Sequence, residues 1–244
     1  MNHKNQKALP ISCICSIYKG TILKEFIISI DSLLVQDYIP NEIVIIVDGI
    51  INKDIEYFLN SILKFETILK VYYIDQNMGL GLALKYGLPK CRNEIVARFD
   101  SDDINLKNRL KIQYDLLKEK PEISIVGSDI LEFNRYEKKV FIKQMENNNI
   151  SENFMIRNPL NHPSVMYRKK DIINVGSYKD IKFFEDYELW LRCIKKGVGI
   201  YNINTTLVAM RRSNYLSNRI GLKYAIFEIK FLIETIKQNT IKKI

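Results

Sequence analysis

The chain has 244 residues, a formal net charge of +9 at pH 7, and a composition that is 47% hydrophobic and 27% charged. These proportions are typical of a soluble globular protein. No apolar run approaches the roughly 20 residues that cross a bilayer, so no membrane-spanning helix is expected. The length fits one domain with a sizeable core, with or without a small subdomain.

The positive charge is scattered along the chain, and no basic cluster is interleaved with aromatic residues. A nucleic-acid partner is therefore not expected, whereas anionic substrates or an anionic membrane surface are compatible with this charge. The polar N-terminus does not resemble a signal peptide, and the cysteines lack the paired spacing of a zinc site. We expect a cytoplasmic protein with reduced thiols. The cysteines are Cys13, Cys15, Cys91 and Cys193.

The first hundred residues alternate between strand and helix patterns. Helical spacing relates Phe26, Ile30 and Leu33, which would share one buried face. Four alternations with short connections favour an α/β fold with a doubly wound, parallel sheet. Strands are expected at residues 11–17, 42–47, 69–74 and 94–99, and helices at residues 21–34, 53–65 and 80–88.

The second half of the chain is more varied. A helix over residues 106–120 is stopped by Pro121, and a strand is expected at 123–126. Short β segments within 127–143 predict a hairpin around Asn134 and Arg135. The remaining expected elements are a loop at 147–149, a brief element at 154–156, a helix over 184–196, a strand pair within 200–210, and a basic amphipathic helix from about 219 to the end.

Three carboxylates follow the apolar strand that ends at Phe99, namely Asp100, Asp102 and Asp103. In open α/β sheets the ligand crevice lies outside the carboxyl ends of the strands, where this cluster would sit. Such close carboxylates repel one another unless a divalent cation, an Arg or a Lys lies between them. A metal–diphosphate site is one interpretation. The other is an acidic loop in which Asp103 caps the helix beginning near Leu106.

Two further acidic positions can also be interpreted either as structural or as functional. Asp48, followed by Gly49, ends the second predicted strand near the expected crevice. Glu185 and Asp186 stand at the start of the helix over 184–196. Acidic residues are favoured at any helix N-terminus by the helix dipole, but a general base also needs an ionised carboxylate beside the attacking hydroxyl.

Taken together and in this order, these features resemble the family-2 glycosyltransferases of the GT-A fold. The likeness covers roughly residues 11–212, and it is greatest with the bacterial subgroup that builds capsule, exopolysaccharide and O-antigen units, the amylovoran-type enzymes. It is densest at residues 77–81, 97–103, 158–164 and 184–191.

The resemblance implies a Rossmann-like, mainly parallel sheet in one GT-A domain over residues 8–212. Residues 8–103 would form the nucleotide-sugar half and residues 104–212 the acceptor and catalytic half. The implied reaction is an inverting transfer from a UDP-sugar, with Mn²⁺ or Mg²⁺ as the cofactor. UDP-glucose or UDP-galactose leads as donor, ahead of N-acetylhexosamine donors, and the acceptor would be a lipid-diphosphate-linked sugar.

By position, Asp100 and Asp102 match the family's Asp-x-Asp motif, with Asp102 as the direct metal ligand. Asp186 matches the carboxylate that deprotonates the acceptor. Many family members carry two consecutive acidic residues before the glycine, whereas this chain has Val47 and Asp48, so the usual base contact at the first position is missing. The residues matched to the nucleotide-sugar site are Asp48, Asn77, Gly79, Asp100 and Ser101.

Other polar residues carry weaker assignments. His162 or Glu185 would contact the acceptor or complete the metal shell, although a structural histidine bonded to backbone fits equally well. Arg211 and Arg212 would bind diphosphate oxygens, since guanidinium groups match phosphate geometry, but surface arginines are the commoner explanation.

Two rival functions share the same residues. A nucleotidyltransferase would need a glycine-rich basic loop after the first strand, where residues 16–20 offer one Gly and one Lys. A non-catalytic sugar-nucleotide-binding module is the other.

Residues 213–244 form the expected basic amphipathic tail, in which Lys223, Lys230 and Lys237 recur every seven residues. It would either seat the enzyme on the inner face of the cytoplasmic membrane or pack on the domain.

Overall fold

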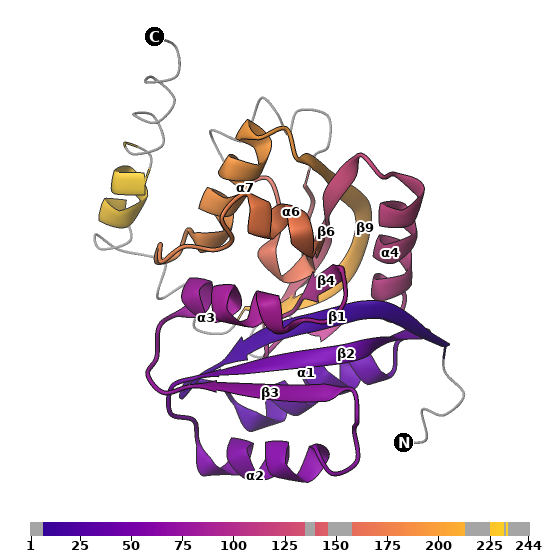
Figure 1. The fold of residues 1–244 in the computed structure, drawn as a ribbon, viewed down its shortest axis with the longest axis vertical. Helices are drawn as coiled ribbons and strands as arrows, with labels where there is room; N and C mark the ends of the chain where they lie inside the picture. Colours follow the sequence, from indigo (N-terminus) through magenta and orange to yellow (C-terminus); the bar gives the residue numbers. More distant parts are fainter. Residues whose placement is uncertain (1–6, 135–139, 146–157, 213–224, 232, 234–244) are drawn as a thin grey trace.

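The computed structural model describes residues 7–134, 140–145, 158–212, 225–231 and 233. These residues contain one nine-stranded sheet with the order β3-β2-β1-β4-β8-β6-β9-β5, in which β7 pairs with β6 (Figure 1). The strands are β1 (Lys7–Ile17), β2 (Tyr38–Asp48), β3 (Leu69–Ile74), β4 (Ile95–Arg98), β5 (Ile104–Asn105), β6 (Ile123–Phe133), β7 (Val140–Lys143), β8 (Met166–Arg168) and β9 (Gly199–Arg211). The α-helices are α1 (Leu23–Leu34), α2 (Lys53–Ile62), α3 (Leu80–Gly87), α4 (Arg109–Glu119), α6 (Lys169–Asn174) and α7 (Glu185–Lys195), and the short 3₁₀ turns are η2 (Leu88–Lys90) and η3 (His162–Ser164).

The sheet is parallel in its first part and mixed in its second. Strands β1 to β4 run parallel to one another, as the sequence predicts. Strand β8 is antiparallel to both β4 and β6, and β6 is parallel to β9. The mainly parallel half therefore ends at β4, beside the acidic cluster.

Helices cover both faces of the sheet, which makes it doubly wound (Figure 1). Alternate side chains of a strand point to opposite faces. Ile11, Cys13 and Ile17 of β1 pack in one core with α1, α2 and α4, whereas Ile14 packs in a second core with α3, α6 and α7. A strand buried on both faces has a nearly continuous apolar sequence, and this explains why the central strands are recognisable in the sequence.

Strand β2 begins at Tyr38, where the sequence predicts a turn through Pro40. Pro40 pairs with Leu9 of β1, so the strand already belongs to the sheet there. On the other side, pairing with β3 starts only at Ile43 and Leu69. A proline has no N–H to donate, and it is tolerated here because its outer edge has no partner strand in the described sheet.

The helix predicted from Leu106 begins at Arg109 as α4, because residues 104–105 form β5 against β9. The capping role considered for Asp103 is therefore wrong. Its Oδ1 accepts the backbone N–H of Arg211 at 2.8 Å, and Asn108 occupies the N-cap position. The carboxylate joins two distant segments of chain instead of starting a helix.

The later β region contains longer strands than the sequence predicts. β6 continues to Phe133 and pairs antiparallel with β7, which confirms the predicted hairpin pairing. The predicted strand pair at 200–210 is wrong, because β9 is a single strand. Its polar middle is accommodated inside the fold, where the buried Asn202 side chain donates to Asp129 Oδ1 at 3.1 Å.

Of the predicted C-terminal helix, residues 225–231 and 233 are described, and they are helical. Phe231 packs against α7, with ring centroids 4.8 Å from Phe184 and 5.1 Å from Tyr187. The elements predicted at 147–149 and 154–156 lie outside the described residues. None of the described helices combines the length and apolar character needed to cross a bilayer.

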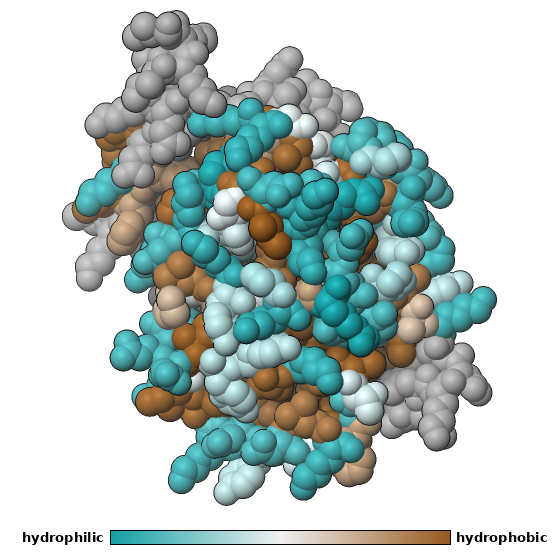
Figure 2. All heavy atoms as spheres, in the orientation of Figure 1, coloured by the Kyte–Doolittle hydropathy of each residue, from teal (hydrophilic) through white to brown (hydrophobic). Residues whose placement is uncertain are grey.

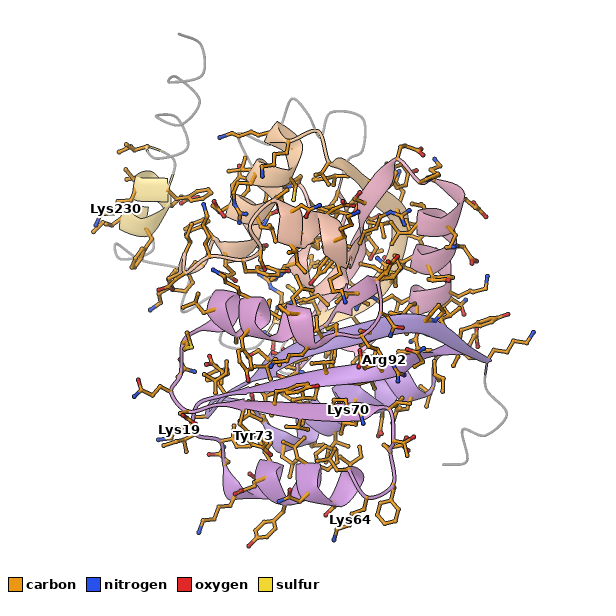
Figure 3. All side chains as sticks on the ribbon, in the orientation of Figure 1. Lys19, Lys64, Lys70, Tyr73, Arg92 and Lys230 are labelled. Atoms are coloured by element: carbon orange, nitrogen blue, oxygen red, sulfur yellow. The ribbon has the colours of Figure 1, made fainter. Side chains whose placement is uncertain are left out.

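The basic side chains labelled in Figure 3 do not form one patch. Lys19, Lys64 and Lys230 lie on three separate parts of the molecule (Figure 3). On the face shown in Figure 2, hydrophobic areas alternate with hydrophilic ones.

Candidate active site

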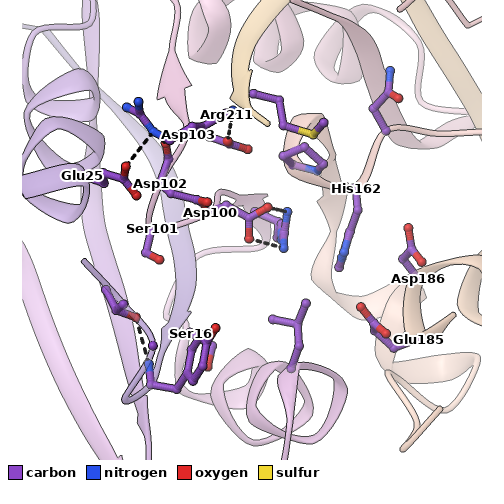
Figure 4. Close-up of a pocket in the computed structure, with 18 of the residues that line it drawn as sticks. Ser16, Glu25, Asp100, Ser101, Asp102, Asp103, His162, Glu185, Asp186 and Arg211 are labelled. Atoms are coloured by element: carbon purple, nitrogen blue, oxygen red, sulfur yellow. Dashed lines mark hydrogen bonds and ion pairs between the residues drawn. The ribbon is translucent and has the colours of Figure 1, made fainter. Parts of the chain in front are cut away.

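A cavity of about 580 Å³ opens at the carboxyl ends of β1, β2 and β4 (Figure 4). Segments that are far apart in sequence contribute its walls, because parallel strands all end at the same edge of the sheet. Every site residue predicted from the sequence lines it except Arg212. The residues brought together are Asp48, Asn77, Gly79, Asp100, Ser101, Asp102, His162, Glu185, Asp186 and Arg211.

The first wall is built on an ion pair between Arg98 and Asp100. Arg98 ends β4 with a side chain that is only 2% exposed, and its two terminal nitrogens donate to the two carboxylate oxygens of Asp100. Burial disfavours a charged guanidinium, yet Asp100 raises the pKa of Arg98 above its ordinary value. The Ser29 hydroxyl of α1 donates to the Asp100 carbonyl at 2.7 Å and holds the same turn.

Asp102 and Asp103 lack such a cation. Burial raises the pKa of Asp102 to about 6, and repulsion from Asp100 adds to the rise. Burial, Asp100 and Asp102 likewise raise the pKa of Asp103 well above its ordinary range. Among the described residues, Asp103 Oδ2 is buried with no hydrogen-bond partner. The wall therefore holds two carboxyl groups that no cation of the described residues pairs with and whose ionisation burial opposes.

This donor set fits a divalent cation. Asp100, Asp102 and Asp103 each offer an oxygen within 4.8 Å of the others. Carboxylate oxygens are the ligands that Mg²⁺ and Mn²⁺ prefer. A cation beside Asp102 would also favour its ionised form, which burial opposes.

Arg211 supports the acidic wall from the side of β9. Its Nε lies 3.3 Å from Glu25 Oε1 and donates to the Asp102 carbonyl at 3.1 Å, while its backbone N–H binds Asp103. Arg211 thus ties α1 and β9 to the acidic turn. Arg212 pairs with Glu132 at 3.3 Å and does not line the cavity.

Asp48 fixes the turn that begins α3. Its two carboxylate oxygens accept the backbone N–H groups of Met78 at 2.7 Å and Gly79 at 2.9 Å. The Asn77 side chain donates to the Asp48 carbonyl at 3.1 Å. Gly79 has φ of +86° and ψ of 161°, a backbone conformation essentially confined to glycine. The Asp48 carboxylate therefore holds backbone on this wall, whereas the sequence predicts a nucleotide-sugar contact.

The second wall is the start of α7, where Asp186 is held in place. Its Oδ2 accepts the Asn158 side-chain amide at 2.7 Å, and its Oδ1 accepts the backbone N–H of Tyr187 at 2.8 Å. Both hydrogen bonds favour the ionised carboxylate, as does the helix N-terminus. Asp186 is 7% exposed, and Trp190, one turn further along α7, is fully buried. The carboxylate is thus oriented by two hydrogen bonds and lies at the cavity surface.

His162 belongs to the second wall rather than to the acidic turn. His162, Glu185 and Asp186 each offer a potential ligand atom within 4.8 Å of the others, and all three face the cavity (Figure 4). The His162 ring nitrogen Nε2 is 3.1 Å from the Tyr178 hydroxyl. The geometry therefore associates His162 with the Glu185–Asp186 pair and a buried tyrosine.

A glycine brings this second wall against α3. A Cβ at Gly81 would clash with the carbonyl oxygen of Lys179 and lie 3.0 Å from the Glu185 Cβ. The absence of a side chain lets α3 approach the segment leading into α7. This contact places the carboxylates of α7 opposite the turn that follows β4.

Arg98, Asn158 and Glu25 are important for this geometry but have no role in the sequence-based assignment, and Arg211 contributes through its backbone N–H as well as its side chain. Arg98 could have been noticed, because it is a charged residue inside an apolar strand. Asn158 lies in a motif-dense segment, but nothing in the sequence connects it to Asp186. Glu25 and the backbone of Arg211 come together with the acidic turn only in the folded chain.

The family-model comparison identifies the chain. The model described as Glycosyl transferase family 2 matches residues 13–177. The chain belongs to glycosyltransferase family 2. This confirms the family expected from the motifs, and the matched segment contains the acidic turn, Asp48, the Asn77–Gly79 turn and His162.

Two relatives of this family-2 glycosyltransferase are a lipid-linked galactosyltransferase and an amylovoran biosynthesis enzyme, which agrees with the predicted subgroup. A UDP-Gal:alpha-D-GlcNAc-diphosphoundecaprenol beta-1,3-galactosyltransferase from Escherichia coli is 36% identical, over 88% of this chain and 73% of the relative. The amylovoran biosynthesis glycosyltransferase AmsE from Erwinia amylovora is 30% identical, over 90% of this chain and 83% of the relative.

A solved structure confirms the GT-A fold. S. aureus TarS 1-349 in complex with UDP-GlcNAc matches with a TM-score of 0.70 at 17% identity, covering 93% of this chain. The chain spans 66% of the length of that solved protein. At this level of identity the likeness concerns the fold.

The raised pKa of Asp102 predicts a pH-dependent metal affinity. A proton and a cation compete for the same carboxylate, so Mn²⁺ affinity should be highest above pH 6 and fall as the pH drops through about 6. Calorimetric titration of Mn²⁺ with UDP between pH 5 and 8 measures this. Asp102→Ala should bind weakly at every pH and remain folded by circular dichroism. Equal affinity of the variant and the wild type at pH 7.5 would contradict the metal assignment.

Proposed function

We propose that this protein is an inverting, metal-dependent hexosyltransferase. It moves galactose or glucose from a UDP-sugar to a lipid-diphosphate-linked saccharide during surface-polysaccharide synthesis. The observation that carries the proposal is the pairing of two carboxylate groups across one cavity. Asp100 and Asp102 lie on one wall, and Asp186 lies on the other, at a helix start.

Each wall of the cavity would serve a different part of the transfer reaction. Asp102 and Asp100 would hold Mn²⁺ or Mg²⁺, which neutralises the charge that develops on the diphosphate leaving group. Asp48, through the Asn77–Gly79 turn, and Ser101 shape the side of the cavity assigned to the nucleotide sugar. The 8–103 half of the chain supplies these residues.

The opposite wall would activate the acceptor. Asp186 Oδ2 or Oδ1 takes the proton from the acceptor hydroxyl as its oxygen attacks the sugar carbon from the face opposite the leaving group. Asn158 and the Tyr187 N–H hold the carboxylate in one orientation, so little reorganisation is needed. A single displacement of this kind inverts the configuration at the sugar carbon. His162 and Glu185 would contact the acceptor sugar beside the base.

The substrate classes are proposed from relatives. The E. coli relative is described as transferring galactose from UDP-Gal to a GlcNAc-diphosphoundecaprenol acceptor. Galactose is therefore the first donor to test and glucose the second, with diphosphate-linked GlcNAc or GalNAc as acceptor.

The product separates this proposal from its rivals. We expect Mn²⁺, UDP-galactose and an undecyl-diphosphate GlcNAc acceptor to give UDP and a disaccharide that mass spectrometry detects. A nucleotidyltransferase acting on a sugar phosphate and UTP would release pyrophosphate instead. A non-catalytic module would bind UDP-sugar without forming either product. Absence of UDP release over a panel of nucleotide sugars and acceptors would overturn the proposal.

Replacing the proposed base should slow transfer without weakening donor binding. Asp186→Asn preserves the size of the side chain and removes the proton acceptor, so we expect kcat to fall by about 10²- to 10⁴-fold. The UDP-sugar affinity should stay within about twofold, because Asp186 lies on the acceptor wall.

Glu185→Gln is the matched control, since it removes the neighbouring carboxylate on the same helix turn. We expect it to retain far more activity than Asp186→Asn. Wild-type transfer by Asp186→Asn together with an inactive Glu185→Gln would assign the base to Glu185 instead.

The C-terminal helix offers a membrane contact for a peripheral enzyme on the inner face of the cytoplasmic membrane. Phe231 packs on α7, so the face that carries it is turned toward the domain. Ile226, Ile229 and Ile233 share another stripe of the helix and are 43%, 56% and 46% exposed. An apolar stripe beside Lys230 suits the interface of an anionic bilayer.

Replacing Ile226, Ile229 and Ile233 together by Ser should reduce sedimentation with anionic liposomes severalfold. Transfer to a short-chain acceptor in detergent-free buffer should be retained, because these residues do not line the cavity. Tyr57→Ser, at an exposed position of α2, controls for the general loss of an exposed apolar side chain. Equal sedimentation of the triple variant and the wild type would rule out this membrane contact.

A further inference from the structure

Strand β7 places three consecutive apolar side chains at the edge of the active-site cavity. Val140, Phe141 and Ile142 are 56%, 49% and 62% exposed. Lys143, the next residue, lines the cavity together with Ile130 and Glu132 of β6. Exposed apolar residues beside a cavity mark binding sites more often than ordinary surface.

The strand register decides which side chains face the cavity. Lys143 pairs with Ile130, and Phe141 pairs with Glu132. Directly opposed residues of an antiparallel pair project from the same face. Since Ile130 and Glu132 line the cavity, Lys143 and Phe141 share that face. Phe141 lies two residues further out than Lys143, about 7 Å along the strand.

A second cation lies beside the phenyl ring. The Arg212 guanidinium is 5.8 Å from the Phe141 ring centroid and pairs with Glu132. Arg212 was expected at the donor diphosphate, but it lies on the hairpin side of the molecule. Going outward from the cavity, this face therefore presents the Lys143 ammonium, the Phe141 ring and the Arg212 guanidinium. Ile142 and Val140 lie on the reverse face of the strand.

The charges around the cavity explain why an anion would use this edge. Both catalytic walls are lined by carboxylates, which repel a phosphate that brings no metal. The cations among the described lining residues are Arg98, Arg211 and Lys143. The Arg98 and Arg211 side chains are 2% and 8% exposed, whereas Lys143 is exposed to solvent at the edge of the cavity.

We propose that this edge, formed by Phe141, Lys143 and Arg212, binds the diphosphate and the first part of the lipid chain of the acceptor. The inference rests on the proposed function for the chemistry of the acceptor. Lys143 contacts the diphosphate. Phe141, over whose ring the Arg212 guanidinium lies, contacts the alkyl chain.

The order of groups favours this occupant over a protein partner or a bare bilayer. An acceptor of this class presents a sugar, then a diphosphate, then an alkyl chain. The protein presents the base Asp186 inside the cavity, then Lys143 at its edge, then apolar β7 residues outside it. The site is continuous with the cavity, so one molecule can occupy both.

Kinetics with three matched acceptors test the site: GlcNAc-diphosphate-undecyl, GlcNAc-diphosphate-methyl, and the undecyl glycoside of GlcNAc without diphosphate. Lys143→Gln should raise the KM of both diphosphate acceptors by about ten- to hundredfold, since it removes a charge-assisted contact. The KM of the undecyl glycoside and of the UDP-sugar should not change. Phe141→Ser should raise KM for the undecyl diphosphate and not for the methyl diphosphate, whereas Ile142→Ser, on the reverse face of the strand, should leave both KM values unchanged.

Lys118→Gln on α4 and Tyr57→Ser on α2 are the matched controls, because both side chains are exposed away from the cavity. If wild type uses the diphosphate acceptors while Lys143→Gln and Phe141→Ser behave like these controls, the site is wrong and the proposed function stands. If Phe141→Ser loses binding to phosphatidylglycerol vesicles with unchanged acceptor KM values, β7 contacts the bilayer and the site is also wrong.

Direct binding separates the remaining cases. If wild type transfers sugar to none of these acceptors, titration with undecyl diphosphate replaces the kinetics. Binding that Lys143→Gln weakens tenfold or more would support the site although the proposed acceptor failed. No binding by the wild type would overturn the site together with the acceptor.

Discussion

At the end of β4 a guanidinium is buried beneath a group of carboxylates, and the active site is arranged around this charge. Arg98 is 2% exposed and engages both oxygens of Asp100. Removing a charge from water costs several kcal/mol unless it is paired and hydrogen-bonded, so the turn after β4 cannot move away from Arg98 without that cost. A second buried guanidinium, Arg109, donates to the Arg98 carbonyl at 2.6 Å and to the Val165 carbonyl at 3.2 Å. Burial lowers the pKa of Arg109 to about 10, which leaves it charged at neutral pH.

Arg98 accounts for the unequal character of the three carboxyl groups. Both oxygens of Asp100 accept from its guanidinium, whereas burial and repulsion from neighbouring carboxylates raise the pKa values of Asp102 and Asp103 and so oppose their ionisation. Arg211 does not neutralise either side chain, because its guanidinium is paired with Glu25. A divalent cation at this turn would favour the ionised forms, which is the physical basis of the proposed metal site.

The carboxylate on the second wall, Asp186, is held by hydrogen bonds rather than by a buried arginine. Asp186 is held by an amide, a backbone N–H and a helix start, all of which favour its charged form. Its helix is fixed by Trp190 in the core and by the close approach of α3 at Gly81. In the proposed reaction, the wall formed by the turn after β4 would hold the cation, and the wall formed by the start of α7 would accept the proton. Lys143 and Phe141 of β7 would extend the proposed acceptor site beyond the cavity.

The sequence by itself determined the alternation of strands and helices up to Phe99, because strands buried on both faces and one-sided helices leave periodic apolar patterns. It also determined the local motifs, including the three carboxylates and the Glu185–Asp186 pair, since each motif is contiguous in the chain. The tertiary structure alone decided which partners these motifs receive. Asp103 accepts a hydrogen bond from the Arg211 backbone, and Asp186 accepts one from the Asn158 side chain. Pro40 lies where β2 pairs with β1 but not yet with β3. Each of these contacts joins segments that are distant in the sequence. Hydrogen bonds and ion pairs act over a few ångströms in space. The positions of two residues in the sequence do not reveal whether they come that close, because the folded sheet brings the strand ends together.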